Sequence, residues 1–342
     1  PAATTIEQLE KKFSIAAKNS YANYSFYLGA TNRNIGQIKN ADKRRVCGIK
    51  LFMGSSTGNM LVDDPVALEK IFAESPLLIA THCEDETIIK RNLDRYKQKY
   101  GEEIPFDMHS EIRSREACIE CSKRAIDYAI RNNSRLHILH ISTAEEIEML
   151  KEAHKINPAI TGEICVHYLW FSKEDFPILG SKIKCNPSIK ESSDREALRK
   201  AVKDGTIRVV ATDHAPHTLQ EKQQPYLAAP SGLPTIQHSL QIMTELVNKG
   251  IFTLEEVAEA MCHGPAECFD IAERGYIREG YKADLVLLDM NRKYTVTPDN
   301  IAYKCKWSPF EGYTFSSSVI HTFINGKPVV KNGSLTGIRA AT

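Results

Sequence analysis

The 342-residue sequence has no apolar run near the ~20 residues that a transmembrane helix requires, and it has almost no net charge. Its 44 Lys and Arg residues balance 43 Asp and Glu residues. A chain with this balance lacks the positive field that draws proteins to nucleic acids or to anionic membranes. We therefore expect neither partner, and we look for a function in individual residues.

The sequence also lacks a disulfide framework. Nine cysteines, an odd number, are scattered along the chain. In a chain of this length such scatter is typical of reduced thiols, which predicts a cytoplasmic protein. Cys118 and Cys121 form the only C-x-x-C, inside a helical pattern over 115–132. Without a second pair they are interpreted as two helix cysteines and not as half of a zinc ribbon.

Short β-branched or apolar runs do occur, and they alternate with amphipathic helical stretches. Thr4-x-x-Glu7 and Ser142-x-x-Glu145 are predicted capping boxes, and Asp64-Pro65 predicts another helix start. This alternation favours a parallel α/β sheet, either doubly wound or a (β/α)8 barrel. Seven strands are predicted: Tyr24–Ala30, Cys47–Met53, Leu77–His82, Leu136–Ile141, Ala159–Val166, Lys182–Asn186 and Ile207–Thr212.

An eight-stranded barrel would need one strand more than these seven. The chain opens at Pro1 on a predicted helix, so we expect the first strand to lie upstream of Pro1. After residue 265 the pattern changes to strands at Ala283–Leu288 and His321–Val330, the second carrying an Asn325-Gly326 hairpin signal. We therefore predict a barrel domain over 1–265 and a small β unit over 266–342.

Polar residues of catalytic or metal-binding type stand at the ends of the predicted barrel strands. In such barrels the active site is built at the carboxyl ends of the strands. A single His in this position is usually structural, but five convergent positions on successive strands indicate a site. The five are Lys50, His82, His140, Asn186 and Asp213.

Imidazoles and a carboxylate suit zinc, which lowers the pKa of a bound water toward 7 when one coordination position stays open. Lysine is a poor ligand, because its ammonium group is itself a cation. It becomes a ligand if CO2 carbamylates the amine. From the residues alone, Lys50 is better interpreted as an ion-pair partner.

The strings GIKLFMGSS, THCED, LHILHIST, KCNPS, ATDHAPH and APSGLPTIQH, in this order and spacing, resemble the dihydroorotases of the cyclic amidohydrolase superfamily. The resemblance extends over essentially the whole chain, including the ending GYIREGYKADLVLLD. It implies a (β/α)8 barrel with a two-zinc centre and a composite β-sandwich. It also implies the reversible cyclisation of N-carbamoyl-L-aspartate to L-dihydroorotate in pyrimidine biosynthesis.

Carried over residue by residue, the resemblance assigns roles within this site. Lys50 would be the carbamylated ligand that bridges two zinc ions, and His82 and His140 would bind the second zinc. Asp213 would bind the first zinc and act as general base and acid while a bridging hydroxide attacks the ring amide. The residues expected to contact the substrate, below a loop over 219–229, are Asn186, His217, Pro230 and Gly232.

One departure from the family pattern stands out. The family's His-x-His-x-Arg motif, which supplies two further zinc ligands and a substrate-binding Arg, does not occur in these 342 residues. We expect it upstream of Pro1. Two rival interpretations stay open: an allantoinase or hydantoinase acting on another cyclic amide, or an inactive dihydroorotase-like scaffold. The resemblance alone suggests a homodimer.

His167 and His214 have equally good structural interpretations and are not predicted to be ligands. Arg113 and Arg115 could bind an anion, but ion pairs near a helix start are the safer expectation.

Overall fold

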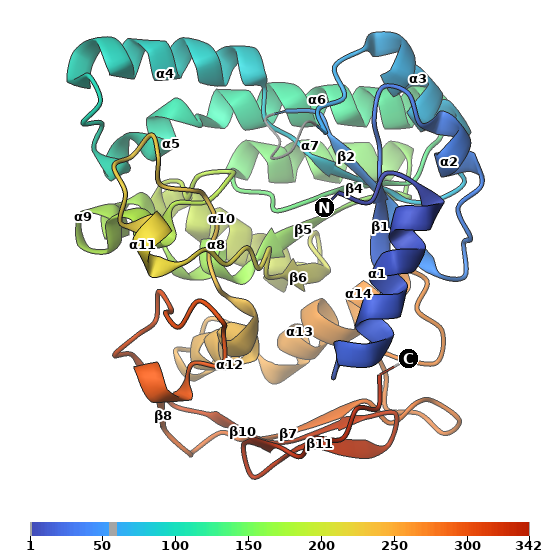
Figure 1. Cartoon of the computed structure of the whole chain (residues 1–342), viewed down its shortest axis with the longest axis vertical. Coiled ribbons are helices and arrows are strands. Elements are labelled where there is room, and N and C mark those ends of the chain that lie inside the picture. Colours follow the sequence, from blue (N-terminus) through green and yellow to red (C-terminus); the bar gives the residue numbers. More distant parts are fainter. Residues whose placement is uncertain (1, 55–59, 342) are drawn as a thin grey trace.

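The computed structural model describes residues 2–54 and 60–341. Pro1 and the Ser55-Ser56 end of the GIKLFMGSS string therefore lie outside the described residues. A curled parallel sheet forms the centre of the molecule, with helices packed around it and a second, antiparallel sheet at one end (Figure 1). This is the predicted α/β architecture of the barrel type.

The parallel sheet has six strands, which are hydrogen-bonded in sequence order. Each strand is joined to the next by a helical connection, as parallel pairing requires. The register places Lys50 beside Ala80 and Phe52 beside His82. The strands are β1 (Phe26–Gly29), β2 (Val46–Phe52), β3 (Ile79–His82), β4 (Leu136–Ile138), β5 (Ile160–Cys165) and β6 (Val209–Ala211).

The predicted strand at Lys182–Asn186 is wrong. Its first half lies in a short 3-10 helix, Gly180–Ile183, and the remainder joins no sheet. β5 pairs directly with β6, with Glu163 opposite Val209, so no place for another strand remains between them. Within the described residues the parallel sheet thus has six strands, where the sequence suggested seven.

Helices cover the outer face of the sheet, and local sequence explains where they begin. The predicted cap at Asp64 before Pro65 is confirmed. The capping boxes are shifted by one residue, because Thr5 and Thr143, and not Thr4 and Ser142, accept from the first-turn amides. The longer helices are α1 (Ile6–Asn19), α3 (Pro65–Glu74), α4 (Glu86–Tyr100), α6 (Arg115–Asn132), α7 (Ala144–Ile156), α10 (Ser192–Lys203) and α12 (Ser239–Asn248).

Shorter helices fill the connections at both ends of the sheet. No helix in residues 2–54 and 60–341 is long and apolar enough to cross a membrane. The shorter α-helices are α2 (Ile35–Lys39), α5 (His109–Ile112), α8 (Val166–Trp170), α9 (Phe176–Leu179), α11 (Leu219–Lys222), α13 (Leu254–Ala258) and α14 (Gly264–Cys268).

The second sheet follows α14 and contains both strands predicted in the C-terminal part. Its order is β12-β11-β10-β7, formed by Ser334–Leu335, Lys327–Lys331, Ser318–Ile324 and Leu285–Asp289. The Asn325-Gly326 turn joins β10 to β11 as predicted. A two-stranded pair, β8 (Tyr294–Thr295) and β9 (Thr314–Phe315), lies between β7 and β10 in the sequence. Phe310 and Phe315 of this region belong to the same hydrophobic core as the parallel sheet.

Candidate metal centre and substrate loop

Four of the predicted site residues stand near or just after the carboxyl ends of strands β2, β3, β4 and β6 of the parallel sheet. Lys50 lies in β2, His82 ends β3, His140 follows β4 and Asp213 follows β6. His140 and Asp213 both have a left-handed backbone, with φ of +42° and +41°. This conformation is uncommon for residues other than glycine, and such strain is concentrated at functional sites.

The imidazoles of His82 and His140 meet edge to face, with Nδ1 of His82 3.0 Å from Nε2 of His140. Both side chains are buried. Burial, followed by the charges near His82 and Lys50, lowers the pKa of His140 well below its usual range. His140 is therefore neutral near pH 7, which is the form of histidine that binds metals.

This pair passes a simple geometric test for zinc. Here the two ring nitrogens share a hydrogen bond; two imidazole nitrogens bound to one tetrahedral zinc at ~2.0–2.1 Å lie about 3.3 Å apart, so a zinc ion could replace the shared proton with little movement of the rings. Nε2 of His82 lies 3.0 Å from Oε2 of Glu84, the kind of carboxylate contact that orients a metal-binding histidine. No third His, Cys, Asp or Glu completes a metal-binding group in the described part of the chain.

Lys50 and Asp213 supply opposite charges beside this pair. Burial lowers the pKa of Lys50, while the carboxylates of Asp213 and Glu163 oppose that shift. The Asp213 side chain is accessible to solvent, yet enough protein surrounds it that desolvation raises its pKa, against the opposing effects of Lys50 and His82. A carboxylate with a raised pKa is better suited to receive and return a proton near neutral pH.

The residues predicted to contact substrate are brought together by two segments that follow β6. Nε2 of His217 lies 3.1 Å from the carbonyl oxygen of Ser231, between Pro230 and Gly232. The amide of Ala215 donates to the carbonyl of Leu233 at 3.1 Å. Asn186 approaches from the segment after the 3-10 helix, and its buried Oδ1 has no hydrogen-bond partner among the described residues.

Two lysines that sequence reasoning missed hold this loop in place. Lys222 is fully buried, and its ammonium group donates to the carbonyl oxygens of Pro230 at 2.8 Å and Gly232 at 3.1 Å. Lys184 donates to the carbonyls of Tyr226 and Ala229 at 2.7 and 2.6 Å. A lysine within a polar surface stretch gives no sequence signal for such burial, so only the fold reveals it.

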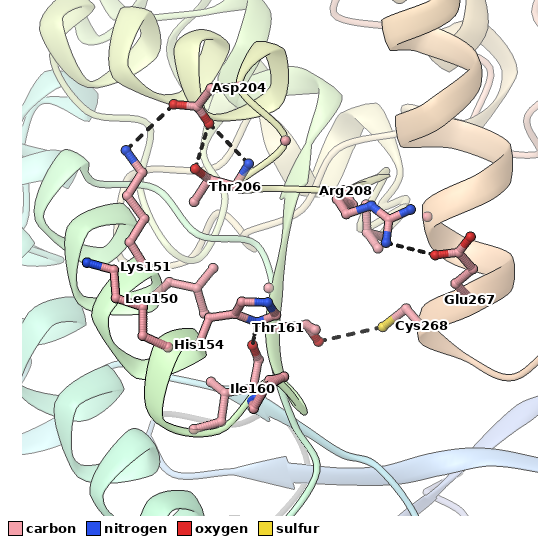
Figure 2. Close-up of a pocket in the computed structure, with 16 residues that line it drawn as sticks. Leu150, Lys151, His154, Ile160, Thr161, Asp204, Thr206, Arg208, Glu267 and Cys268 are labelled. Atoms are coloured by element: carbon pink, nitrogen blue, oxygen red, sulfur yellow. Dashed lines mark hydrogen bonds and ion pairs between the residues drawn. The ribbon is translucent and has the colours of Figure 1, made fainter.

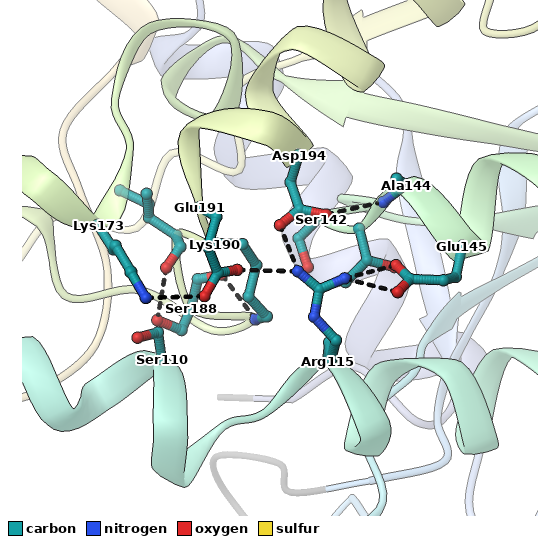
Figure 3. A network of polar contacts seen from close by, with 12 residues as sticks. Ser110, Arg115, Ser142, Ala144, Glu145, Lys173, Ser188, Lys190, Glu191 and Asp194 are labelled. Atoms are coloured by element: carbon teal, nitrogen blue, oxygen red, sulfur yellow. Dashed lines mark hydrogen bonds and ion pairs between the residues drawn. The ribbon is translucent and has the colours of Figure 1, made fainter.

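Arg113 forms an ion pair just before a helix, as expected, but its partner Glu84 and the burial of the pair were not assigned from the sequence. Burial tends to raise the pKa of Glu84, but Arg113 and His82 together lower it to about 2. Arg115 also lies in the expected ion-pair network near a helix start, contacting carboxylates from α7 and from the start of α10 (Figure 3). Its partners are Glu145, Glu191 and Asp194.

The other histidines near the site divide as follows. Nδ1 of His214 accepts from the backbone amide of Thr235 at 3.1 Å, which is a structural contact. His167 is buried, and neither of its ring nitrogens has a partner among the described residues. Burial lowers its pKa to about 3, so it stays neutral.

Comparison with known proteins shows which family has this architecture. The profile of the amidohydrolase family matches residues 68–329. A dihydroorotase of Pyrococcus furiosus is 32% identical over 324 residues, covering 94% of this chain and 68% of that protein. A dihydroorotase of Methanosarcina acetivorans is 30% identical over 350 residues, covering 96% of this chain and 74% of that protein.

Solved structures share the fold at lower identity. The L-hydantoinase of Arthrobacter aurescens superposes with a TM-score of 0.95 at 24% identity, covering 100% of this chain and 78% of that one. An inactive dihydroorotase-like domain of a Chaetomium thermophilum multifunctional protein superposes with a TM-score of 0.70 at 17% identity, covering 100% of this chain and 84% of that one. The six-stranded parallel sheet, the family match and the sequence relatives together show that this chain belongs to the amidohydrolase family.

Proposed function

We propose that this chain, a hydrolase acting on cyclic amides, is a dihydroorotase that interconverts N-carbamoyl-L-aspartate and L-dihydroorotate. The names of its sequence relatives support this substrate. The structural observation that carries the proposal is the contact of His82 with His140, 3.0 Å apart, at strand ends that also present Lys50 and Asp213. The proposal places the reaction in pyrimidine biosynthesis and in the cytoplasm.

The donor set fits a zinc ion at the histidine pair. His82 and His140 would hold it through their ring nitrogens, with Glu84 orienting His82. Lys50 would join the site as a carbamate, since its ammonium form repels a cation. When bound, zinc would polarise the amide carbonyl and lower the pKa of water. The resemblance implies two zinc ions in a complete site, but these 342 residues contain no His-x-His pair for the other ion.

Asp213 is the proposed proton carrier. Its carboxylate takes a proton from the attacking water and delivers it to the amide nitrogen that leaves when the ring opens. The raised pKa of Asp213 brings the two protonation states closer to balance near neutral pH. Asn186, His217 and the backbone of Pro230 and Gly232 are proposed to hold the substrate, because His217 contacts the 230–232 segment and the amide of Gly232 ties that segment to Lys184, two residues before Asn186.

A comparison of substrates tests the proposal. We would incubate the zinc-loaded chain separately with L-dihydroorotate, hydantoin and allantoin, and follow ring opening by chromatography. We expect turnover of L-dihydroorotate above the other two. Turnover of hydantoin or allantoin without turnover of L-dihydroorotate would overturn the substrate assignment while retaining a cyclic-amide hydrolase.

A second candidate function is a dihydroorotase-like scaffold without activity. It is favoured by one observation, that no three His, Cys, Asp or Glu side chains in residues 2–54 and 60–341 form a metal-binding group. Metal analysis separates the two candidates. Less than one zinc per chain after dialysis against zinc, together with no turnover of any substrate, would favour the scaffold.

A further inference from the structure

A second cluster of reactive side chains joins β4 and β5 to the end of α14. His137 of β4 is fully buried, and its Nε2 lies 3.1 Å from Oε2 of Glu163 on β5. Its other ring nitrogen, Nδ1, lies 2.8 Å from the Thr161 hydroxyl and 3.4 Å from Sγ of Cys268 at the end of α14. One imidazole therefore bridges a carboxylate and a thiol, and the site proposed above uses neither the imidazole nor the thiol.

This order of groups has a chemical consequence. A carboxylate that accepts from Nε2–H leaves the Nδ1 lone pair facing both the Thr161 hydroxyl and the thiol, so the imidazole can take the thiol proton when the hydroxyl turns away. The product is a thiolate beside an imidazolium, which is the reactive form of cysteine. Once Nδ1 carries the proton it no longer accepts from Thr161, and the Thr161 hydroxyl, 3.6 Å from Sγ, can then donate to the thiolate.

The electrostatics agree with this geometry. Burial alone would raise the pKa of Cys268, but the hydrogen bond and charge of His137 outweigh it, and the net pKa is lowered. Burial likewise opposes the charged form of His137, yet Cys268 and Glu163 raise its pKa to about 9. Both shifts favour the thiolate–imidazolium pair at pH 7.

The thiol also has an approach route. Cys268 and Thr161 line a cavity of about 670 Å³, bounded by α7, the amino end of β5, the segment 204–209 before β6 and α14 (Figure 2). This volume is in the range that admits a small molecule. Arg208 on its wall is neutralised by Glu259 and Glu267, so the cavity does not select for anions through that residue.

We propose that Cys268 is a modification site, a nucleophilic thiol that reacts with small peroxides and with soft carbon electrophiles entering this cavity. With a peroxide, the thiolate attacks one oxygen, an S–O bond forms and the O–O bond breaks. The sulfur is oxidised to sulfenic acid and the peroxide is reduced. The leaving oxygen takes the proton of the His137 imidazolium and departs as water or an alcohol.

The other thiols of the chain provide the comparison. Cys262, two turns earlier, is more exposed than Cys268, but desolvation raises its pKa. Accessibility alone therefore predicts faster reaction at Cys262, whereas the cluster predicts faster reaction at Cys268. The buried thiols, which should react slowest, are Cys83, Cys118, Cys121, Cys165 and Cys185.

Peptide mass spectrometry on the folded full chain decides between these orders. With limiting iodoacetamide at pH 7, we expect Cys268 to be alkylated at least about tenfold faster than Cys262. Between pH 6 and 8 the rate at Cys268 should rise less steeply with pH than the rate at Cys262, which should rise about tenfold per pH unit. Equal rates, a faster Cys262, or a steep pH profile at Cys268 would overturn the proposal.

Two further arms test the partner and the oxidant. His137→Gln should slow alkylation of Cys268 and leave Cys262 unchanged. If His137→Gln unfolds, the buried cysteines will also be alkylated, which identifies the unfolding. In that case the pH dependence of alkylation in the wild type still tests the proposal. With hydrogen peroxide followed by dimedone, the adduct should form at Cys268, persist in Cys262→Ser and disappear in Cys268→Ser. Alkylation without a dimedone adduct would refute the peroxide chemistry. None of these outcomes depends on the proposed dihydroorotase activity.

Discussion

The ammonium group of Lys222 lies 2.8 Å from the carbonyl oxygen of Pro230 and is fully buried. The same ammonium donates to Lys184 and Gly232, both at 3.1 Å. Burial lowers the pKa of Lys222 to about 7, and its amino group, shared by three carbonyls, fixes the loop that the proposed function assigns to substrate binding. The loop therefore depends on a residue that need not touch the substrate.

Lys222→Met tests this dependence. Removing the ammonium leaves buried carbonyls without a donor, at a cost of about 1–3 kcal/mol for each group that water cannot reach. We expect a lower free energy of unfolding and a rise in KM for L-dihydroorotate larger than the fall in kcat. Urea unfolding and steady-state kinetics measure both. Lys123→Met, on the exposed face of α6, is the control and should change neither. An unchanged KM in Lys222→Met would contradict the positioning role.

Gly232 is the position in this loop where a side chain is least tolerated. Its φ is +139°, and a Cβ atom there would lie 2.4 Å from the carbonyl oxygen of Ala215. Gly232→Ala must therefore displace the segment that carries His217, and we expect KM to rise at least about tenfold. Gly36→Ala is the matched control, since a Cβ there meets nothing within 4 Å. In α2 it should be neutral or stabilise by about 0.5–1 kcal/mol. Equal kinetics in both variants would contradict the steric argument.

The strand-end residues were predictable from the sequence because parallel strands impose their own pattern. His82, His140 and Asp213 each stand at or near the end of an apolar run. Parallel strands align their carboxyl ends, and this rule alone predicts that the three residues lie at one end of the sheet. The Lys182–Asn186 run misled because a short apolar stretch does not distinguish a strand from a buried irregular segment. The structure excludes a strand there because β5 pairs directly with β6. Such pairing joins residues far apart in the sequence, so the local pattern does not reveal it.

The contacts that the sequence did not reveal all join distant segments. Lys222 meets Lys184 across 38 residues, and Glu84 meets Arg113 across 29. Each of these residues has an ordinary surface interpretation in its own segment, since charged side chains are rarely fully buried. Cys268 meets His137 across 131 residues, so no local pattern could have joined them.

Glu84→Gln tests the buried ion pair beside the histidines. The folded pKa of Glu84, about 2, lies below the ~4.3 of an unfolded glutamate, so its stabilisation is present above the unfolded value and lost as pH falls toward 2. The shift corresponds to a contribution on the order of 3 kcal/mol at pH 7. The variant should be less stable than wild type by a similar amount, because Arg113 loses its partner.

The pH dependence distinguishes this effect from simple misfolding. Urea unfolding at about pH 5, 4 and 3 measures the free energy of unfolding of wild type and Glu84→Gln. The difference between these free energies should become smaller as the pH falls, because only the wild type loses the contribution of this carboxylate. Glu74→Gln, which removes an exposed ion pair with Lys39, is the control and should show little difference at any pH. If the difference in free energy of unfolding between wild type and Glu84→Gln stays constant with pH, the Glu84–Arg113 ion pair is not the cause of that difference.

Asp213→Asn tests the proposed proton carrier. The amide has nearly the same volume but cannot accept the proton, so we expect kcat for L-dihydroorotate to fall about 10²–10⁴-fold. The thermal unfolding midpoint should stay within a few degrees of wild type, since the side chain is accessible to solvent. Asp127→Asn on α6 is the control for a surface carboxylate. Near-normal kcat in Asp213→Asn would remove this residue from the mechanism.

Lys50 decides whether the site uses a carbamate. Lys50→Ala should lose most bound zinc after dialysis, measured by elemental analysis, and short carboxylic acids such as acetate should restore part of both the zinc and the activity. Restoration is expected because the acid supplies an anionic oxygen pair where the carbamate stood. Lys50→Arg keeps the positive charge, cannot form the carbamate and should behave like Lys50→Ala before rescue. If Lys50→Arg instead retains zinc and activity, Lys50 acts through its charge near Asp213, as an ordinary ion-pair lysine would.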